Sequence, residues 1–564
     1  MRFGESARKL AGRLAVSIVA AVSVVAAASV GVVLTSASTG SAAPSARPSC
    51  SGGTQVRTKS GPVCGVTADG VTSYLGIPYA APPVGRLRWA PPRSPAPWTS
   101  AFQATVAGNI CPGPSVTGGP VTGSEDCLNL NVQVPAGAHR RRLPVMVEIH
   151  GGGFLDPIGP SNGSHLVSAG HVVYVAMNYR LGILGFMANR ALGRHSGDYG
   201  LQDQQASLRW VQHNIAAFGG NPHNVTILGQ SAGGASVCAQ VASPTANGLF
   251  QRGIPESGFY NAAVGPNRVW EPADCKSQIP TERQAQQAGA RFARKVGCRP
   301  SDLACLRAVP VNTLIAAGGK VDDPTAHGTS ATIAPTINGT TLPMSPGKAF
   351  RTGHLNRVSL MNGVDRDEIN GGASLTAPIA NTAAQFRSQV RKQYRRLARK
   401  VFKLYPLRRF PSPFVAYRTV VADSDSVCPA LATDRALSRY IPVYAWQNDD
   451  ADMPLAYYPQ FLIQTDPYGA YHIAADPFLF PQPSVTLSPD QAVLAAQFTA
   501  EAVGYARRGN PTAPRTPLWT RFTRRSHDVM TLVPAGDSAL SGAANIAQQH
   551  HCDFWDAVTR QPRS

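Results

Sequence analysis

Short apolar runs and longer stretches with apolar residues at helical spacing follow one another along this chain. Val145 to His150 and Val172 to Asn178 are almost continuous apolar runs, the pattern of buried strands. Between Leu201 and Phe218, apolar residues recur at helical spacing and stop at a pair of glycines, which predicts an amphipathic helix. Ser488-Pro489 predicts the start of a later helix that Gly509-Asn510-Pro511 ends. We expect these elements to belong to one large α/β domain.

The segment from Phe386 to Leu404 also has helical spacing, but its outer positions are strongly basic. Its apolar residues alternate with Arg387, Arg391, Lys392, Arg395, Arg396, Arg399, Lys400 and Lys403. The pattern predicts an amphipathic helix with a solvated basic face. Weak contact of this helix with an anionic cell-surface polymer or lipid is the alternative interpretation.

A further apolar run, Val225 to Leu228, leads directly into the sequence GQSAGGAS at 229–236. This pattern is typical of a nucleophilic serine on a sharp turn between a strand and a helix. The glycines on both sides leave room for the strained backbone of the turn. With 53 glycines in the chain the motif alone is weak evidence. Ser231 is therefore a candidate nucleophile that needs support from other segments.

Support comes from the strand Val145 to His150, which continues into Gly151-Gly152-Gly153-Phe154. Consecutive glycines leave backbone N–H groups unobstructed, and such groups stabilise the negative oxygen of a tetrahedral intermediate. A flexible glycine turn is the alternative. We expect the N–H groups of Gly152, Gly153 and Ala232 to form an oxyanion hole.

The chain resembles the type-B carboxylesterase/lipase family, the branch of the α/β-hydrolases that includes the cholinesterases. The likeness rests on motifs that follow the family's order along nearly the whole chain after the first 50 residues. They are YLGIPYAAPPVGRLRW at 74–89, SEDCLNLNV at 124–132, HGGGF at 150–154, MNYRLGILGF at 177–186, the stretch 197–236, DRDEIN at 365–370, YGAYHIAADPFLF at 468–480 and ARRGNPTAPRTPLW at 506–519. The resemblance implies an α/β-hydrolase fold, with a large, mostly parallel central sheet flanked by helices and long insertions.

The same resemblance places the acid of a catalytic triad on Glu368 and its histidine on His472. The order serine, acid, histidine is that of α/β-hydrolases. Ile369 stands where the family usually has glycine, so Asp365 and Asp367 remain alternatives for the acid. Ser257 occupies a place where the family often has a second serine near the histidine.

The resemblance implies a carboxylesterase that acts through an acyl-enzyme on Ser231 and needs no metal or cofactor. The stretch between Cys111 and Cys127 contains no Trp, Tyr or Phe, whereas the family's cholinesterases have an aromatic wall there. Gln230 replaces the acidic residue that often precedes the serine. We therefore expect short to medium uncharged esters as substrates. A secreted lipase or sterol esterase is the alternative, and a non-catalytic cholinesterase-like surface-binding protein is a weaker one.

Ten cysteines indicate an oxidising compartment. The resemblance implies a disulfide between Cys111 and Cys127, and Cys298 with Cys305 is the second choice. Cys50 with Cys64 is possible on proximity alone, and the remaining cysteines are left unassigned. The resemblance also implies buried ion pairs between Arg180 and Asp203, and between Glu125 and either Arg86 or Arg88.

Residues 1–43 have basic residues, then a long apolar stretch, then small residues that end at Ala43. This order predicts a cleaved secretory signal, with an uncleaved anchor as the alternative. Residues 44–564 are then one exported α/β-hydrolase domain, because no linker or repeat divides them. The formal net charge is +20, but no nucleic-acid-binding motif accompanies it, so we expect no nucleic-acid partner.

Overall fold

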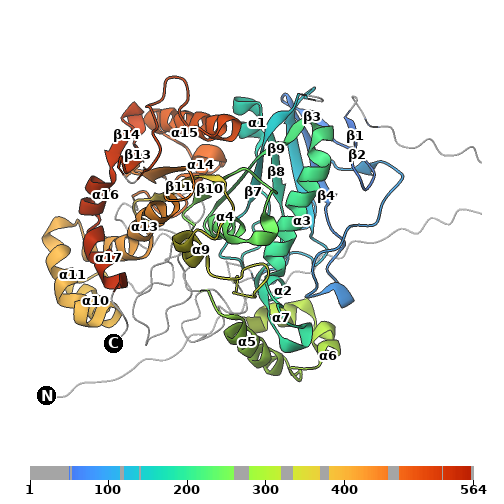
Figure 1. The fold of residues 1–564 in the computed structure, drawn as a ribbon, viewed down its shortest axis with the longest axis horizontal. Helices are drawn as coiled ribbons and strands as arrows, with labels where there is room; N and C mark the ends of the chain where they lie inside the picture. The colour runs from blue at the N-terminus through green and yellow to red at the C-terminus, as the bar shows by residue number, and fades with distance from the viewer. Residues whose placement is uncertain are drawn as a thin grey trace, which may run out of the picture. The chain divides into compact units, whose positions relative to one another are not determined.

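The computed structural model describes residues 50, 54–114, 120–138, 141–258, 279–318, 334–368, 380–454, 469–523 and 525–560. All of them belong to one compact unit, Arg47–Ser564 (Figure 1). The predicted signal segment, residues 1–43, lies outside the described residues.

A large sheet forms the centre of this unit and has 11 strands within the described residues. From β13 to β8 in sheet order, every neighbouring pair is parallel, and the outer pairs are antiparallel. The expected large, mostly parallel sheet is therefore confirmed. The sheet order is β14 (Ala539–Gly542), β13 (Asp528–Leu532), β12 (Val443–Asn448), β11 (Ser359–Asp365), β10 (Arg252–Glu256), β9 (Gly220–Gln230), β7 (Leu143–Ile149), β8 (Val173–Met177), β6 (Asn129–Pro135), β4 (Val71–Pro78) and β3 (Val66–Ala68). A smaller sheet contains β1 (Gln55–Arg57), β2 (Pro62–Cys64) and β5 (Phe102–Gln103).

Helices cover both faces of the large sheet. Successive side chains of a strand point to opposite faces, so a buried strand contributes apolar side chains to the packing on each face. In β7, Val145 and Val147 belong to one apolar cluster and Met146 to another. The first cluster includes side chains of α3 (Tyr199–Asn214), α4 (Ala232–Ala242) and α13 (Cys428–Leu437). The second includes side chains of α1 (Ser164–Gly170), α14 (Asp476–Leu479) and α15 (Pro489–Arg508). The two apolar cores therefore lie on either side of the sheet.

The structure describes ten further α-helices. They comprise α2 (Gly182–Phe186), α5 (Glu282–Lys295), α6 (Leu303–Ala308), α7 (Val311–Gly318), α9 (Pro346–Thr352), α10 (Ala383–Tyr394), α11 (Ala398–Leu404), α12 (Pro413–Ala422), α16 (Ala543–Gln549) and α17 (Cys552–Arg560). Among the described residues, none of the helices combines the length and the apolar character that crossing a bilayer requires.

Two helix boundaries agree with their sequence signals. The 3-10 turn after α3 ends at Gly219, whose φ of 87° suits glycine. Ser488 caps α15 by accepting a hydrogen bond from the N–H of Gln491, and Gly509 ends that helix with a φ of 73°.

The prediction of one continuous helix from 386 to 404 is wrong. Residues 395–397 form a 3-10 turn between α10 and α11, and Arg395 has a φ of 44° and a ψ of −115°. An α-helix cannot continue through that conformation. The break lets both shorter helices bury their apolar residues, among them Phe386, Val390 and Val401, in the same core.

Four disulfides lie within the described residues. Cys111 is bonded to Cys127 and Cys298 to Cys305. Cys50 with Cys64, and Cys428 with Cys552, are two further bonded pairs. The second of these, which joins α13 to α17, had no signal in the sequence.

Candidate active site

The candidate residues lie where parallel strands end. Ser231 directly follows β9, and Gly151 to Phe154 follow β7. Ser257 directly follows β10, and Glu368 lies three residues after β11. The carboxyl ends of parallel strands meet at one edge of a sheet, which is where open α/β sheets bind their ligands. His472 reaches the same edge from the segment before α14.

Ser231 lies on a strained turn. Its φ is 58° and its ψ is −121°, and it is the residue immediately before α4. Its N–H donates a hydrogen bond to the carbonyl oxygen of Glu256 at 3.0 Å. A Cβ atom at Gly229 would lie 2.5 Å from the carbonyl oxygen of Ile149, and one at Gly233 would lie 2.0 Å from it. The two glycines therefore allow the turn to pack against the end of β7, which explains their spacing around the serine.

Ser231, His472 and Glu368 form a chain of hydrogen bonds. The Oγ atom of Ser231 lies 2.9 Å from Nε2 of His472, and Nδ1 of His472 lies 2.6 Å from Oε2 of Glu368. The carboxylate of Glu368 is fully buried, whereas His472 retains 8 % exposure. Because Nδ1–H donates to the carboxylate, Nε2 is left to accept the serine proton. The structure thus brings the three sequence-predicted residues together in the order that base-assisted nucleophilic attack requires.

The two alternative acids have other partners. Asp365 accepts a hydrogen bond from the N–H of Ile473 at 3.1 Å, and Asp367 accepts one from the N–H of Ala470 at 3.0 Å. Burial and the nearby Glu368 carboxylate raise the pKa of Asp365 well above its usual value. Both side chains therefore hold the segment around His472, and it is Glu368 that bonds to the imidazole.

Ser257 acts on the acid rather than on the histidine. It is fully buried, and its hydroxyl donates a hydrogen bond to Oε1 of Glu368. The N–H of Asp365 donates to the same oxygen at 3.0 Å. These two donors keep the carboxylate turned so that Oε2 faces His472.

The three amides of the expected oxyanion hole have no acceptor among the described residues. The N–H groups of Gly152, Gly153 and Ala232 donate no hydrogen bond to any residue that the structure describes. Gly152 and Gly153 have φ values of 94° and 61°, which glycine adopts without strain. Ala232 is the first residue of α4, where amide groups have no partner within the helix and favour negative charge.

His150 orders the start of this loop. It stacks on Tyr179, with ring centroids 4.5 Å apart, and Nδ1–H donates to the carbonyl oxygen of Gly151 at 3.0 Å. Burial lowers the pKa of His150 to about 4, so the ring is neutral near pH 7. A neutral ring places no fixed positive charge beside the three free amides.

Gln230 also contacts the histidine, a role that the sequence analysis missed. Its Nε2 atom lies 3.2 Å from Nε2 of His472. The sequence analysis used only its lack of charge. The signal for the contact was its position at the end of β9, directly before the nucleophile.

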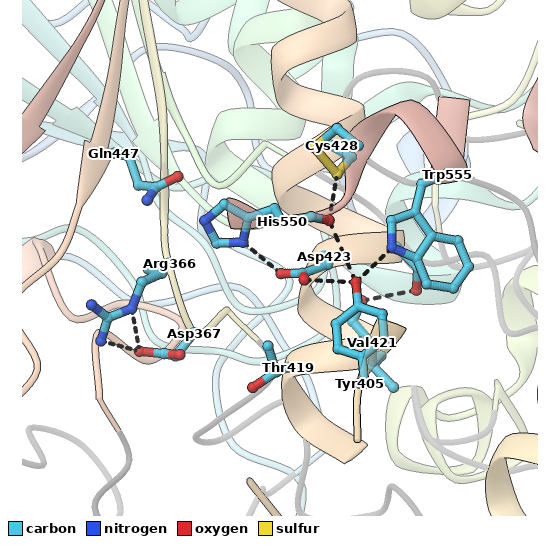
Figure 2. Close-up of polar contacts among 12 residues, drawn as sticks. Arg366, Asp367, Tyr405, Thr419, Val421, Asp423, Cys428, Gln447, His550 and Trp555 are labelled. Carbon is cyan, nitrogen blue, oxygen red and sulfur yellow. Dashed lines mark hydrogen bonds and ion pairs between the residues drawn. A yellow bond between two sulfur atoms is a disulfide. The ribbon is translucent and has the colours of Figure 1, made fainter. Parts of the chain in front are cut away.

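A second buried histidine–carboxylate pair lies elsewhere (Figure 2). Nδ1 of His550 is 2.6 Å from Oδ1 of Asp423, and the hydroxyl of Tyr405 donates to Oδ2 of the same carboxylate at 2.8 Å. Nε2 of His550 has no hydrogen-bond partner among the described residues, so this pair activates no nucleophile there. We interpret it as structural.

The two expected ion pairs are both formed. Arg180 and Asp203 are buried and bonded at 2.7 and 2.8 Å. Glu125 pairs with Arg88, the second of the two alternatives, at 2.7 Å.

The chain is similar to carboxylesterases over most of its length. Residues 52–555 match the Carboxylesterase family. The sequence is 33 % identical to the para-nitrobenzyl esterase of Bacillus subtilis, over 84 % of this chain and 94 % of the esterase. It is 30 % identical to the cholinesterase of Mus musculus, over 89 % of this chain and 85 % of that protein. Two solved structures agree. A PNB esterase aligns with this chain at a TM-score of 0.71 and 30 % identity. The carboxylesterase of Geobacillus stearothermophilus aligns at a TM-score of 0.72 and 28 % identity. Each alignment covers 88 % of this chain and 99 % of the solved structure's chain.

Proposed function

Because this chain belongs to the carboxylesterase family and is a carboxylic ester hydrolase, we propose that it works through an acyl-enzyme on Ser231. The observation that carries this proposal is the continuous hydrogen-bond chain from Ser231 through His472 to Glu368. It lies beside three amides that lack an acceptor among the described residues.

Acylation begins when Ser231 attacks the ester carbonyl and His472 takes the serine proton on Nε2. Glu368 stabilises the imidazolium that forms. The carbonyl oxygen becomes an oxyanion, which accepts hydrogen bonds from Gly152, Gly153 and Ala232. Loss of one such donor costs roughly 2.7 to 4 kcal/mol of barrier. The C–O bond then breaks, and His472 gives its proton to the leaving alcohol.

Deacylation repeats these steps with water as the nucleophile. His472 takes a proton from water, hydroxide adds to the acyl carbonyl, and the second tetrahedral intermediate uses the same three amides. Collapse of this intermediate releases the carboxylic acid, and His472 returns a proton to Ser231.

Short to medium uncharged esters are the proposed substrates. The stretch between Cys111 and Cys127 has no aromatic side chain to face a cation, and Gln230 adds no negative charge beside His472. The similarity to a para-nitrobenzyl esterase supports uncharged aromatic esters as test compounds.

The test is hydrolysis of nitrophenyl esters from acetate to palmitate by the wild type and by Ser231→Ala. We expect the highest kcat/KM at short chains and a loss of at least about 10⁴-fold in the variant. Ser388→Ala, which changes an exposed serine on α10, is the matched control and is expected to retain activity. Undiminished hydrolysis by Ser231→Ala contradicts the nucleophile. The highest rates on long chains above their solubility limit favour a lipase instead.

Export is the remaining part of the proposal. Four disulfides within the described residues fit folding in an oxidising compartment, and residues 1–43 have the order of a secretory signal. N-terminal sequencing of protein from the culture medium is expected to begin at Pro44. A mature protein that begins at Met1 contradicts cleavage.

A further inference from the structure

The insertion that contains α10 and α11 carries a dense set of exposed positive charges. No Asp or Glu occurs between residues 369 and 422. We call the ten exposed basic side chains of this segment the basic face. They are Arg387, Arg391, Lys392, Arg395, Arg396, Arg399, Lys400, Lys403, Arg408 and Arg409.

Few of these charges are close to an acidic side chain that the structure describes. The nine members of the basic face other than Arg395 form no ion pair with a residue that the structure describes. Arg391 and Lys400 lie over the rings of Phe402 and Phe554, at 5.8 and 5.5 Å from the ring centroids. Like charges three or four positions apart on a helix destabilise it. An anionic partner would remove this repulsion.

The apolar sides of the two helices are already used by the protein. Phe386, Val390 and Val401 are at most 2 % exposed and belong to the first apolar core. An amphipathic helix that lies within a bilayer needs its apolar face free. Contact of the basic face with a bilayer would therefore be electrostatic, without insertion of side chains into the hydrocarbon.

The helices that carry the basic face are attached to buried side chains, and Figure 2 shows one of them, Tyr405. Tyr405, the residue after α11, donates to Asp423 at 2.8 Å and accepts a hydrogen bond from Nε1 of Trp555 at 2.8 Å. The hydroxyl of Tyr394, at the end of α10, lies 2.9 Å from Oγ of Ser424. Both helices are thus fastened to buried side chains, which holds their backbones against the core.

We propose that the basic face is a docking surface for an anionic phospholipid bilayer. Seven of the ten side chains are Arg, whose planar donors match phosphate oxygens in pairs. The helix α10 alone is about 18 Å long, so the charges are spread over an area that several lipid headgroups occupy. The nearby rings of Phe402 and Phe410 are half-buried and pack on Phe386 and Tyr405, which limits the area open to base stacking. This disfavours single-stranded nucleic acid as the partner.

The test is co-sedimentation of the full chain with phosphatidylcholine vesicles that contain or lack phosphatidylglycerol. We expect binding only to the anionic vesicles. It should weaken at least about tenfold between about 0.05 M and 0.5 M salt, because charge contacts outside the membrane are screened. The quadruple variant with Gln at Arg387, Lys392, Arg396 and Arg399 is expected to bind at least about tenfold more weakly than the wild type.

A matched variant separates this surface from net charge alone. It places Gln at Arg57, Arg194, Arg291 and Arg299, four exposed residues outside the basic face. It loses the same formal charge and is expected to keep vesicle binding within about threefold of the wild type. Both variants are expected to hydrolyse a soluble ester at the wild-type rate, which shows that they are folded. The proposal is overturned if both variants lose binding equally, if salt has no effect, or if duplex DNA is bound more tightly than the vesicles at the same salt.

Discussion

Gln230 stands directly before Ser231, and its amide nitrogen lies 3.2 Å from Nε2 of His472. In the resting enzyme Nε2 accepts a hydrogen bond from the Ser231 hydroxyl, and the Gln230 amide is a second, uncharged donor to the same lone pair. Gln230 therefore contacts the base without adding charge. We regard it as a positioning residue in the proposed reaction.

Replacing Gln230 with Glu would put a carboxylate beside the imidazolium and stabilise it. The acidic limb of the kcat/KM profile is then expected to move to higher pH by about one unit, because an opposite charge within about 4–6 Å favours the charged form. Gln230→Ala, which removes the contact without adding charge, is the control and should shift the limb much less. Identical profiles for the wild type and Gln230→Glu would show that residue 230 does not act on the base.

At the level of elements, the turn between β9 and α4 is the tightest constraint on the site. It must place Ser231 in a strained conformation while Gly229 and Gly233 lie against the carbonyl oxygen of Ile149 in β7. The same strand leads into the glycine loop with the free amides. Contact between these two strand ends therefore fixes the nucleophile relative to the oxyanion donors.

Gly233→Ala tests this constraint. Its Cβ would lie 2.0 Å from the backbone oxygen of Ile149, so β7 or the turn must move. We expect a destabilisation of about 3 kcal/mol and loss of esterase activity, measured by thermal melting and by nitrophenyl acetate hydrolysis. Gly542→Ala is the control, because a Cβ there meets nothing within 4 Å. A melting temperature for Gly233→Ala equal to that of the control would show that the turn relaxes without cost.

At the level of the whole molecule, one disulfide joins parts of the chain that are far apart in sequence. Cys428 and Cys552 are separated by 124 positions, whereas Cys298 and Cys305 are separated by 7. Both Cys428 and Cys552 are buried. The carbonyl oxygen of His550 accepts a hydrogen bond from the hydroxyl of Tyr405 and lies close to Sγ of Cys428 (Figure 2). The longer loop constrains the unfolded chain more strongly.

The loop-entropy relation predicts a loss of about 5 kcal/mol when Cys428 and Cys552 are both replaced by Ala, and of about 2.4 kcal/mol for the Cys298 and Cys305 pair. Denaturant unfolding of the two double variants, followed by fluorescence, measures the difference. The order of the two losses is the prediction. A larger loss for the 298–305 pair would mean that packing around the sulfur atoms outweighs chain entropy.

The sequence predicted the fold well where an element's signal is local. Glycines at the ends of α3 and α15, apolar runs in β7 and β8, and the serine motif after β9 all follow from backbone geometry close to those residues. The single helix predicted over 386–404 failed because helical spacing continues unbroken through Arg395. The break depends on the packing of α10 and α11 against the same apolar core, and no helix-ending residue near 395 predicts it.

By itself, the sequence determined which residues were candidates for the site, because nucleophile turns and oxyanion loops require glycines at set distances along the chain. Only the tertiary structure decided which of three neighbouring carboxylates lies against His472, that Ser257 holds that carboxylate, and that Gln230 touches the imidazole. Those contacts join the ends of different strands. The geometry of these contacts depends on how the strands pair across the sheet. That pairing cannot be predicted from the residues that neighbour each contact in the sequence.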